Sequence, residues 1–308
     1  MEEQAEVGAP GDAWAQGPLA RLSKVAEQDL PAALYVVATP LGNAADVSVR
    51  ALWVLRASQA IACEDTRTSG AFLLRFGIRA PRLALHRHNE AGAAAPILER
   101  IARGERVALV SDAGTPAISD PGARLVRAAL DAGLRVVPVP GPSSLTAALS
   151  VAGIASTRIR FVGFAPTAAR ARETFWAEVA GGADAAVVFE APHRIASAAQ
   201  EIALRVQAGR RIVLARELTK QFEEVVQASA ATLAQAIESS PARGEYVLVF
   251  DAWEAQDAAP EDGAAIDATT LRWLAALREE LPPARLAAVA ARASGIARET
   301  LYRAVRGA

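Results

Sequence analysis

The feature that most constrains the fold is an alternation, in the first half of the chain, between short unbroken apolar runs and stretches with helical periodicity. The apolar runs lie at 33–38, 60–63, 83–85, 107–110 and 135–139, and a helical stretch follows each of them. Unbroken apolar runs are typical of strands covered on both faces, and strands that alternate with helices form parallel sheets. The sequence therefore predicts an α/β fold whose first unit is a parallel sheet.

The second half of the chain has more strands than helices. Strands are predicted at 161–164, 185–189, 211–215, 223–227 and 245–250, with helices near 168–180, 194–208 and 230–239. This pattern predicts a second α/β unit that is built on a mixed sheet.

Composition shifts divide the chain into five segments. Gly, Pro and Ala mixed with acids, without a sustained period, are typical of extensions and linkers, whereas the last forty residues have helical spacing broken by Pro and Gly. We expect a disordered extension at 1–31, an N-terminal α/β domain at 32–156, a second α/β domain at 157–252, a linker at 253–266 and a helix-turn-helix-like segment at 267–308.

Charge and cysteine content exclude several classes of protein. With 33 Lys and Arg against 34 Asp and Glu, the chain is no uniformly basic nucleic-acid-coating protein. The segment 267–308, however, holds seven Arg against four acidic residues, so a basic surface can be local. The one cysteine, Cys63, excludes a disulfide scaffold and a cysteine zinc site. No signal peptide and no membrane-length apolar run are visible, so we expect a cytoplasmic protein without a membrane partner.

Small and polar residues follow the predicted strands of the first unit. These loops are Thr39–Asn43, Ser111–Pro116, Ser119–Gly122 and Pro140–Ser144. Each alone has the composition of an ordinary turn, but the carboxyl ends of parallel strands share one edge of the sheet, where ligands bind. Gly and Ala also let a ligand approach backbone N–H groups. Four such loops together favour a binding cleft.

Familiar motifs for nucleotides and for nucleophilic catalysis are absent from the sequence. It has no G-x-x-x-x-G-K-[ST] loop, no G-x-G-x-x-G after a strand and no G-x-S-x-G elbow. His86 and His88 could share a metal ion, but the third histidine, His193, is distant in sequence. We interpret the pair as loop residues at the rim of a site and expect no metal.

Taken together, the motifs resemble the ribosomal RNA small subunit methyltransferase I family, which belongs to the tetrapyrrole methylase superfamily. Members of this family methylate the 2′-oxygen of a cytidine in the decoding region of 16S rRNA. The resemblance runs from about 33 to 306 and rests on the segments 34–43, 64–67, 85–90, 110–122, 140–144, 189–194, 216–224 and 243–246.

The resemblance implies a two-domain tetrapyrrole-methylase-like fold, a homodimer, and 16S rRNA or the small ribosomal subunit as partner. It also implies that S-adenosylmethionine binds in the cleft between the domains. The implied cofactor-binding residues are Pro40, Asp112, Ala113, Gly114, Thr115, Pro142, Ser143, Ser144, Glu190, Ala191, Gly244 and Glu245.

Methyl transfer to a hydroxyl needs alignment of the reacting atoms and removal of the hydroxyl proton. Candidates for the base or for orienting the hydroxyl are Glu64, Asp65, His86 and Glu223, and the sequence does not choose among them. Candidates for gripping RNA phosphates are Arg67, Arg194 and Lys220. For some of these residues a structural role is the alternative: acids at 64–65 and the pair at 193–194 also suit helix starts, and Lys220 suits an exposed strand end.

Two other functions compete with RNA methylation. A tetrapyrrole or other small-molecule methylase of the same fold leaves the basic helical tail unexplained. A non-enzymatic nucleic-acid-binding regulator leaves the small-residue loops and the segment 64–67 unexplained. RNA methylation is the interpretation that uses all of these features.

Overall fold

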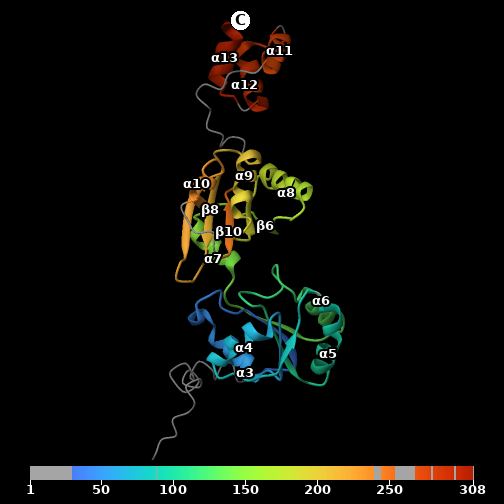
Figure 1. Ribbon diagram of the computed structural model, residues 1–308. Helices are drawn as coiled ribbons and strands as arrows, with labels where there is room; N and C mark the ends of the chain where they lie inside the picture. The colour runs from blue at the N-terminus through green and yellow to red at the C-terminus, as the bar shows by residue number, and fades with distance from the viewer. Residues whose placement is uncertain are drawn as a thin grey trace, which may run out of the picture.

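The computed structural model describes residues 30–87, 89–238, 244–253, 268–278, 280–294 and 296–307. Nearly all of the predicted extension and linker therefore lies outside the described residues. Within them, two α/β units and a group of C-terminal helices follow one another along the chain (Figure 1).

The first unit is a parallel sheet, as the sequence predicts. Its strands are β1 Ala33–Val37, β2 Ala60–Cys63, β3 Arg82–Ala84, β4 Arg106–Val110 and β5 Val136–Val139. They are hydrogen-bonded in the order β3-β2-β4-β1-β5, and every pair is parallel.

Helices cover both faces of this sheet, which explains why its strands are unbroken apolar runs. The connecting helices are the 3₁₀ turn η2 Ala44–Asp46, α3 Val49–Ala57, α4 Thr66–Arg75, α5 Glu90–Ala102 and α6 Ala123–Asp131. Helices α3 and α4 pack on one face through residues such as Leu55 and Leu73. Helices α5 and α6 pack on the other face through Ile97 and Leu125.

The neighbouring strands β1 and β4 are the point at which the chain reverses its direction across the sheet. After β1 the chain runs through α3 to β2, whereas after β4 it runs through α6, on the opposite face, to β5. The two loops therefore separate at the carboxyl ends of adjacent strands. In open α/β sheets a ligand crevice forms at such a switch point.

The second unit is a mixed sheet, which confirms the prediction. Its strands are β6 Ile159–Phe164, β7 Ala185–Glu190, β8 Arg211–Arg216, β9 Glu224–Ser229 and β10 Tyr246–Phe250. They are ordered β6-β7-β10-β8-β9, with β6 parallel to β7 and the other pairs antiparallel.

Within the described residues, four helices cover this second sheet, namely α7 Ser144–Ala152, α8 Ala169–Gly181, α9 Ile195–Arg205 and α10 Leu233–Glu238. Helices α8, α9 and α10 pack on one face around the buried Trp176. Helix α7 covers the other face, where its Ala148 and Ala152 contact the core around Val247. Although the sequence analysis counted α7 with the residues at 32–156, its core contacts belong to the second sheet.

The C-terminal helices have a core of their own. They are α11 Ala268–Leu277, α12 Pro283–Ser294 and α13 Arg298–Gly307, and they pack through Leu274, Leu286 and Leu301. Three short helices are what the sequence predicts for this segment. Among the described residues, no helix combines the length and the apolar character that a membrane crossing requires.

Glu90, the first residue of α5, stabilises the end of the loop after β4 through its side chain. The Glu90 carboxylate, which is only 7% exposed, accepts hydrogen bonds from the backbone N–H groups of Gly122 (3.0 Å), Arg124 (2.8 Å) and Leu125 (3.4 Å). It therefore caps α6 from another helix, a role that a residue of the helix's own sequence usually fills.

We expect Glu90→Ala to lower the free energy of unfolding by about 2 kcal/mol, because buried N–H groups lose their acceptor. Urea unfolding followed by circular dichroism measures this change. Glu99→Ala, which removes an exposed carboxylate from the same helix, is the matched control and is expected to change stability by less than about 0.5 kcal/mol. Equal effects of the two substitutions would contradict the capping role.

Candidate functional site

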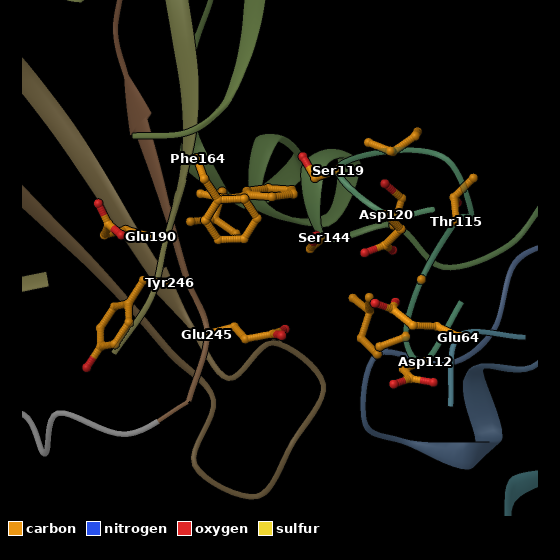
Figure 2. A pocket seen from close by; sticks show the side chains of 17 residues that line it. Glu64, Asp112, Thr115, Ser119, Asp120, Ser144, Phe164, Glu190, Glu245 and Tyr246 are labelled. Carbon is orange, nitrogen blue, oxygen red and sulfur yellow. The ribbon is translucent and has the colours of Figure 1, made fainter. Parts of the chain in front are cut away.

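A cavity of about 260 Å³ lies between the two α/β units, where the carboxyl-end loops of the first sheet face the second sheet. Figure 2 shows Glu64, Asp112 and Asp120 on one side of it and Glu190, Glu245 and Tyr246 on the other. The lining residues are Leu41, Glu64, Asp112, Ala113, Gly114, Thr115, Ile118, Ser119, Asp120, Ser143, Ser144, Phe164, Phe189, Glu190, Glu245, Tyr246 and Val247.

The first-sheet side of the cavity is organised by a two-residue bridge between its loops. The N–H of Thr39 donates to the carbonyl of Gly114, and the N–H of Gly114 donates to the carbonyl of Thr39, both at 2.9 Å. The Thr39 hydroxyl also donates to the carbonyl of Ser111 at 3.1 Å. These bonds join the loop after β1 to the loop after β4, whose Gly114 lines the cavity.

Left-handed backbone conformations concentrate at this cleft. In the part of the chain that the structure describes, the non-glycine residues with positive φ are Ala117 (67°), Ser119 (64°), Glu217 (50°) and Thr219 (69°). Two lie in the loop that lines the cavity, and two lie in the turn after β8. Such conformations cost free energy and are commonly kept at functional sites.

Five carboxyl groups line the cavity, and burial raises the pKa of several of them. Burial raises the pKa of Glu64, and the nearby Asp112 carboxylate raises it further. Burial also raises the pKa of Asp112, although the N–H of Asp65 donates to its carboxylate at 3.2 Å. Glu190 is 1% exposed, and burial raises its pKa against the opposing effects of the Ala191 N–H and the Arg194 guanidinium.

Asp120 is the most perturbed of these groups. Burial, followed by the negative charges of Glu64 and Glu245, raises its pKa to about 6. No hydrogen bond to its carboxylate is found among the described residues. Asp120 therefore exchanges a proton close to neutral pH at the cavity surface.

An irregularity in β6 builds the apolar wall of the cavity. Residues three apart in a regular strand face opposite sides of the sheet. The pairing of β6 with β7 shifts between Phe161 and Gly163, where Gly163 has a φ of 72°. As a result both Phe161 and Phe164 contact Phe189, with ring centroids 4.9 and 5.5 Å apart. Phe164 remains 47% exposed and is available to an apolar part of a ligand.

The turn after β8 connects the two units beside the cavity. The ammonium group of Lys220 is paired with the Glu217 carboxylate at 2.7 Å. The N–H of Asn43 donates to the Thr219 hydroxyl at 3.2 Å. A side chain at Gly42 would collide with the Lys220 stem, and one at Gly244 would collide with Glu217. Both glycines therefore make room for this ion pair between the units.

The structure brings most of the predicted cofactor-binding residues together. Those that line the cavity are Asp112, Ala113, Gly114, Thr115, Ser143, Ser144, Glu190 and Glu245. Pro40 lines a neighbouring cavity instead, and the Pro142 carbonyl accepts a hydrogen bond from the Thr115 hydroxyl at 3.0 Å. Ala191 contributes an N–H to the Glu190 carboxylate at 2.8 Å, and Gly244 lies against Glu217.

Of the predicted catalytic residues, only Glu64 lines the cavity. Asp65 is the N-cap of α4: its carboxylate accepts from the N–H groups of Arg67 (2.7 Å) and Thr68 (3.4 Å), which lowers its pKa. The N–H of His86 donates to the Asn89 side chain at 2.8 Å. The Glu223 carboxylate accepts from the Thr219 N–H at 2.5 Å and so stabilises the turn after β8.

The predicted RNA-binding residues have different surroundings. Arg67 is exposed on α4. The Arg194 guanidinium contacts the Glu190 carboxylate at 3.2 Å and donates to the carbonyl of Ala165 at 2.6 Å, so it links β7 to the segment after β6. Lys220 forms the ion pair with Glu217. Their contact with RNA stays a prediction.

Several lining residues were not singled out from the sequence, notably Ile118, Phe164, Phe189 and Tyr246. Ser119 and Asp120 lie in the loop Ser119–Gly122, which the sequence assigned to the binding cleft without a role for either residue. Loop composition was the signal for these two, and the resemblance covered Ile118. Phe164 had no such signal, because only the β6 irregularity turns it toward the cavity.

No group of three or more His, Cys, Asp and Glu side chains within the described ranges is arranged to hold a metal ion. His88, one of the two histidines considered for such a site, lies outside the described residues.

We expect Asp120→Asn to stabilise the protein at pH 8 more than at pH 4. With a folded-state pKa of about 6, above the ordinary value, Asp120 binds more protons in the folded than in the unfolded chain. Stability is therefore lost as pH rises from about 4 to about 6, and the neutral amide removes that loss. Urea unfolding midpoints across this range measure it, with Asp131→Asn on the exposed end of α6 as control. A gain that is the same at both pH values would contradict the assigned environment.

Comparison with protein families and solved structures identifies the fold. The family model of tetrapyrrole (corrin/porphyrin) methylases matches residues 33–234. Among solved structures, cobalt precorrin-4 methyltransferase superposes with a TM-score of 0.53 at 17% identity, covering 71% of this chain and 95% of that one. Uroporphyrin-III C-methyltransferase from Thermus thermophilus gives a TM-score of 0.51 at 19% identity, covering 71% and 94%. These likenesses show the fold.

Curated relatives are much closer in sequence. The ribosomal RNA small subunit methyltransferase I of Xylella fastidiosa is 46% identical over 88% of this chain and 98% of its own length. The proteins of the same name from Escherichia coli O157:H7 and Pseudomonas aeruginosa are 42% and 44% identical, covering 88% and 87% of this chain. The chain belongs to the ribosomal RNA small subunit methyltransferase I family, with the fold of the tetrapyrrole methylases.

Proposed function

We propose that this protein methylates the 2′-oxygen of a cytidine ribose in the decoding region of 16S rRNA, with S-adenosylmethionine as methyl donor. The observation that supports this most strongly is near full-length similarity, at 39–46% identity, to relatives named ribosomal RNA small subunit methyltransferase I. A protein with this role acts in the cytoplasm on 16S rRNA or the small ribosomal subunit.

The chemistry of the cavity fits this cofactor. S-adenosylmethionine, when bound, supplies a methyl group that is activated by a positively charged sulfonium. Among the described residues, five carboxyl groups and no Lys or Arg line the cavity, and such a lining favours a ligand with positive charge. Phe164 and Phe189 offer apolar surface to its adenine. A uroporphyrin-III C-methyltransferase of this fold has been solved in complex with S-adenyl homocysteine.

The residues of the chain then have three tasks. Backbone groups of Ala113, Gly114 and Thr115 hold the cofactor, since small residues permit close approach. The walls from both units exclude water. Glu64 is the strongest of the four base candidates, because it alone of them lines the cavity and burial raises its pKa toward the working pH. It would orient the ribose hydroxyl and accept its proton.

The negative lining also determines where RNA is held. Phosphates are repelled from a cavity that is lined by carboxyl groups, so we expect the neutral ribose to reach it while the phosphates stay outside. Arginines outside the cavity, such as Arg67, and the basic helices at 267–308 are then left to hold the RNA backbone. A methylase that acts on a small molecule would not need basic residues to bind an RNA backbone. The homodimer stays a prediction, which light scattering of the purified protein checks.

The test is methyl transfer from labelled S-adenosylmethionine to small ribosomal subunits, followed by mass spectrometry of the nucleosides. We expect label in a single 2′-O-methylcytidine of 16S rRNA, and at least a hundredfold lower kcat for Glu64→Gln. Asp65→Asn, which alters the neighbouring helix cap, is the control. Transfer only to a tetrapyrrole, or transfer to no substrate, would refute the proposal.

We also expect that removal of residues 267–308 abolishes RNA methylation and spares cofactor binding. The helices of this segment pack on a core of their own, and none of the segment's described residues lines the cofactor cavity. Calorimetric titration with S-adenosylhomocysteine measures binding, and the transfer assay measures activity. Loss of cofactor binding, or full RNA methylation, would contradict the assigned role.

A further inference from the structure

A second cavity, of about 300 Å³, lies next to the cofactor cavity and has a different chemistry. It is formed between the loop after β1 and the side of α4, and it shares Leu41 and Asp112 with the first cavity. Of the described residues, Asp112 is the only carboxylate in its lining, whereas Arg75 and Phe72 of α4 contribute a cation and an aromatic ring.

We propose that this second cavity binds one unstacked nucleotide of the RNA substrate, with Phe72 as the surface for the base and Arg75 as a phosphate contact. The inference rests on the proposed function and names the residues that receive the RNA. Neither Phe72 nor Arg75 is among the predicted catalytic, cofactor-binding or RNA-binding residues, and neither lines the cofactor cavity.

The first argument is that the two cavities differ in the charge of their lining residues. The cofactor cavity has five carboxyl groups, and the neighbouring one has a single carboxylate at the shared wall and a guanidinium at the rim. An anionic strand is therefore repelled by one cavity and attracted by the other. The Arg75 guanidinium is exposed and makes no ion pair with the described residues, so its charge is free for a phosphate.

The second argument is the spacing of groups on α4. Thr68, Phe72 and Arg75 follow one another at intervals of four and three residues, so they lie on one side of the helix and all line the cavity. The Thr68 hydroxyl is exposed and makes no hydrogen bond within the described residues. A hydroxyl, a ring and a cation in a row match the polar edge, the face and the phosphate of one nucleotide.

The third argument is the shared wall. Because Leu41 and Asp112 border both cavities, a nucleotide in the second places its ribose beside the first. Enzymes that modify a nucleotide commonly take it out of its stack into a pocket. Phe72 is only half-buried and meets Phe76 edge-on at 5.4 Å between ring centroids, which fixes its ring and leaves part of it open to the cavity.

The test uses the full-length protein and a fluorescent, cytidine-containing single-stranded oligoribonucleotide, with anisotropy as readout. We expect Phe72→Leu to weaken binding about tenfold, because a stacking ring is lost, and Phe72→Tyr to retain it. Arg75→Gln should weaken binding and reduce the slope of log K against log salt by about 0.7. Arg127→Gln, an equal charge change on the exposed side of α6, should match the parent protein.

Two further measurements keep the outcomes distinct. Calorimetry with S-adenosylhomocysteine should show unchanged cofactor affinity in Phe72→Leu and Arg75→Gln, and the KM for small ribosomal subunits should rise about tenfold. RNA affinity equal to the parent, or cofactor affinity lost in parallel, would overturn the proposal.

Loss of self-association in light scattering, with RNA affinity intact, would overturn it too and assign this face to a second copy. If the parent protein binds RNA but transfers no methyl group to it, the proposed function fails while the binding measurements still decide this proposal.

Discussion

The paired hydrogen bonds between Thr39 and Gly114 are the interaction on which the site depends. They join the loops that leave two adjacent strands, β1 and β4, although the helices after these loops lie on opposite faces of the sheet. Without this bridge the two loops would diverge. With it, and with Glu90 holding the far end of the second loop, seven residues between Ser111 and Gly122 line one cavity, namely Asp112, Ala113, Gly114, Thr115, Ile118, Ser119 and Asp120.

Charge is sorted over short distances in this molecule, although the whole chain carries a net charge of −1. Carboxyl groups from both units face the cofactor cavity, and arginines of α4 lie exposed just outside it. This arrangement separates the two ligands that we propose. A cationic donor is favoured inside, and an anionic strand is favoured along the outer wall. The average composition of the chain does not reveal either surface.

Much of the fold could be predicted because local patterns report burial directly. The runs at 33–38 and 107–110 are unbroken because both faces of their strands are covered, and the loops after them follow from chain order. The cavity residues Asp112 to Thr115 were found for the same reason. Phe164 was not found, since its orientation depends on a shift in pairing between β6 and β7 that no local pattern encodes. Helix α7 likewise precedes the second sheet in the chain and packs against it through alanines that have no strong periodic signal.

The sequence by itself determined the alternation of strands and helices, the loops that face the cleft and the family to which the chain belongs. These depend on residue type and on spacing along the chain. Only the tertiary structure decided which acid enters the cavity: Glu64 lines it, whereas the adjacent Asp65 caps α4. The raised pKa of Asp120, about 6, also depends on the tertiary structure. Its causes are burial and the negative charges of Glu64 and Glu245, which belong to segments distant from Asp120 in the sequence. Electrostatic environment is a property of three-dimensional neighbours, and a linear pattern does not contain it.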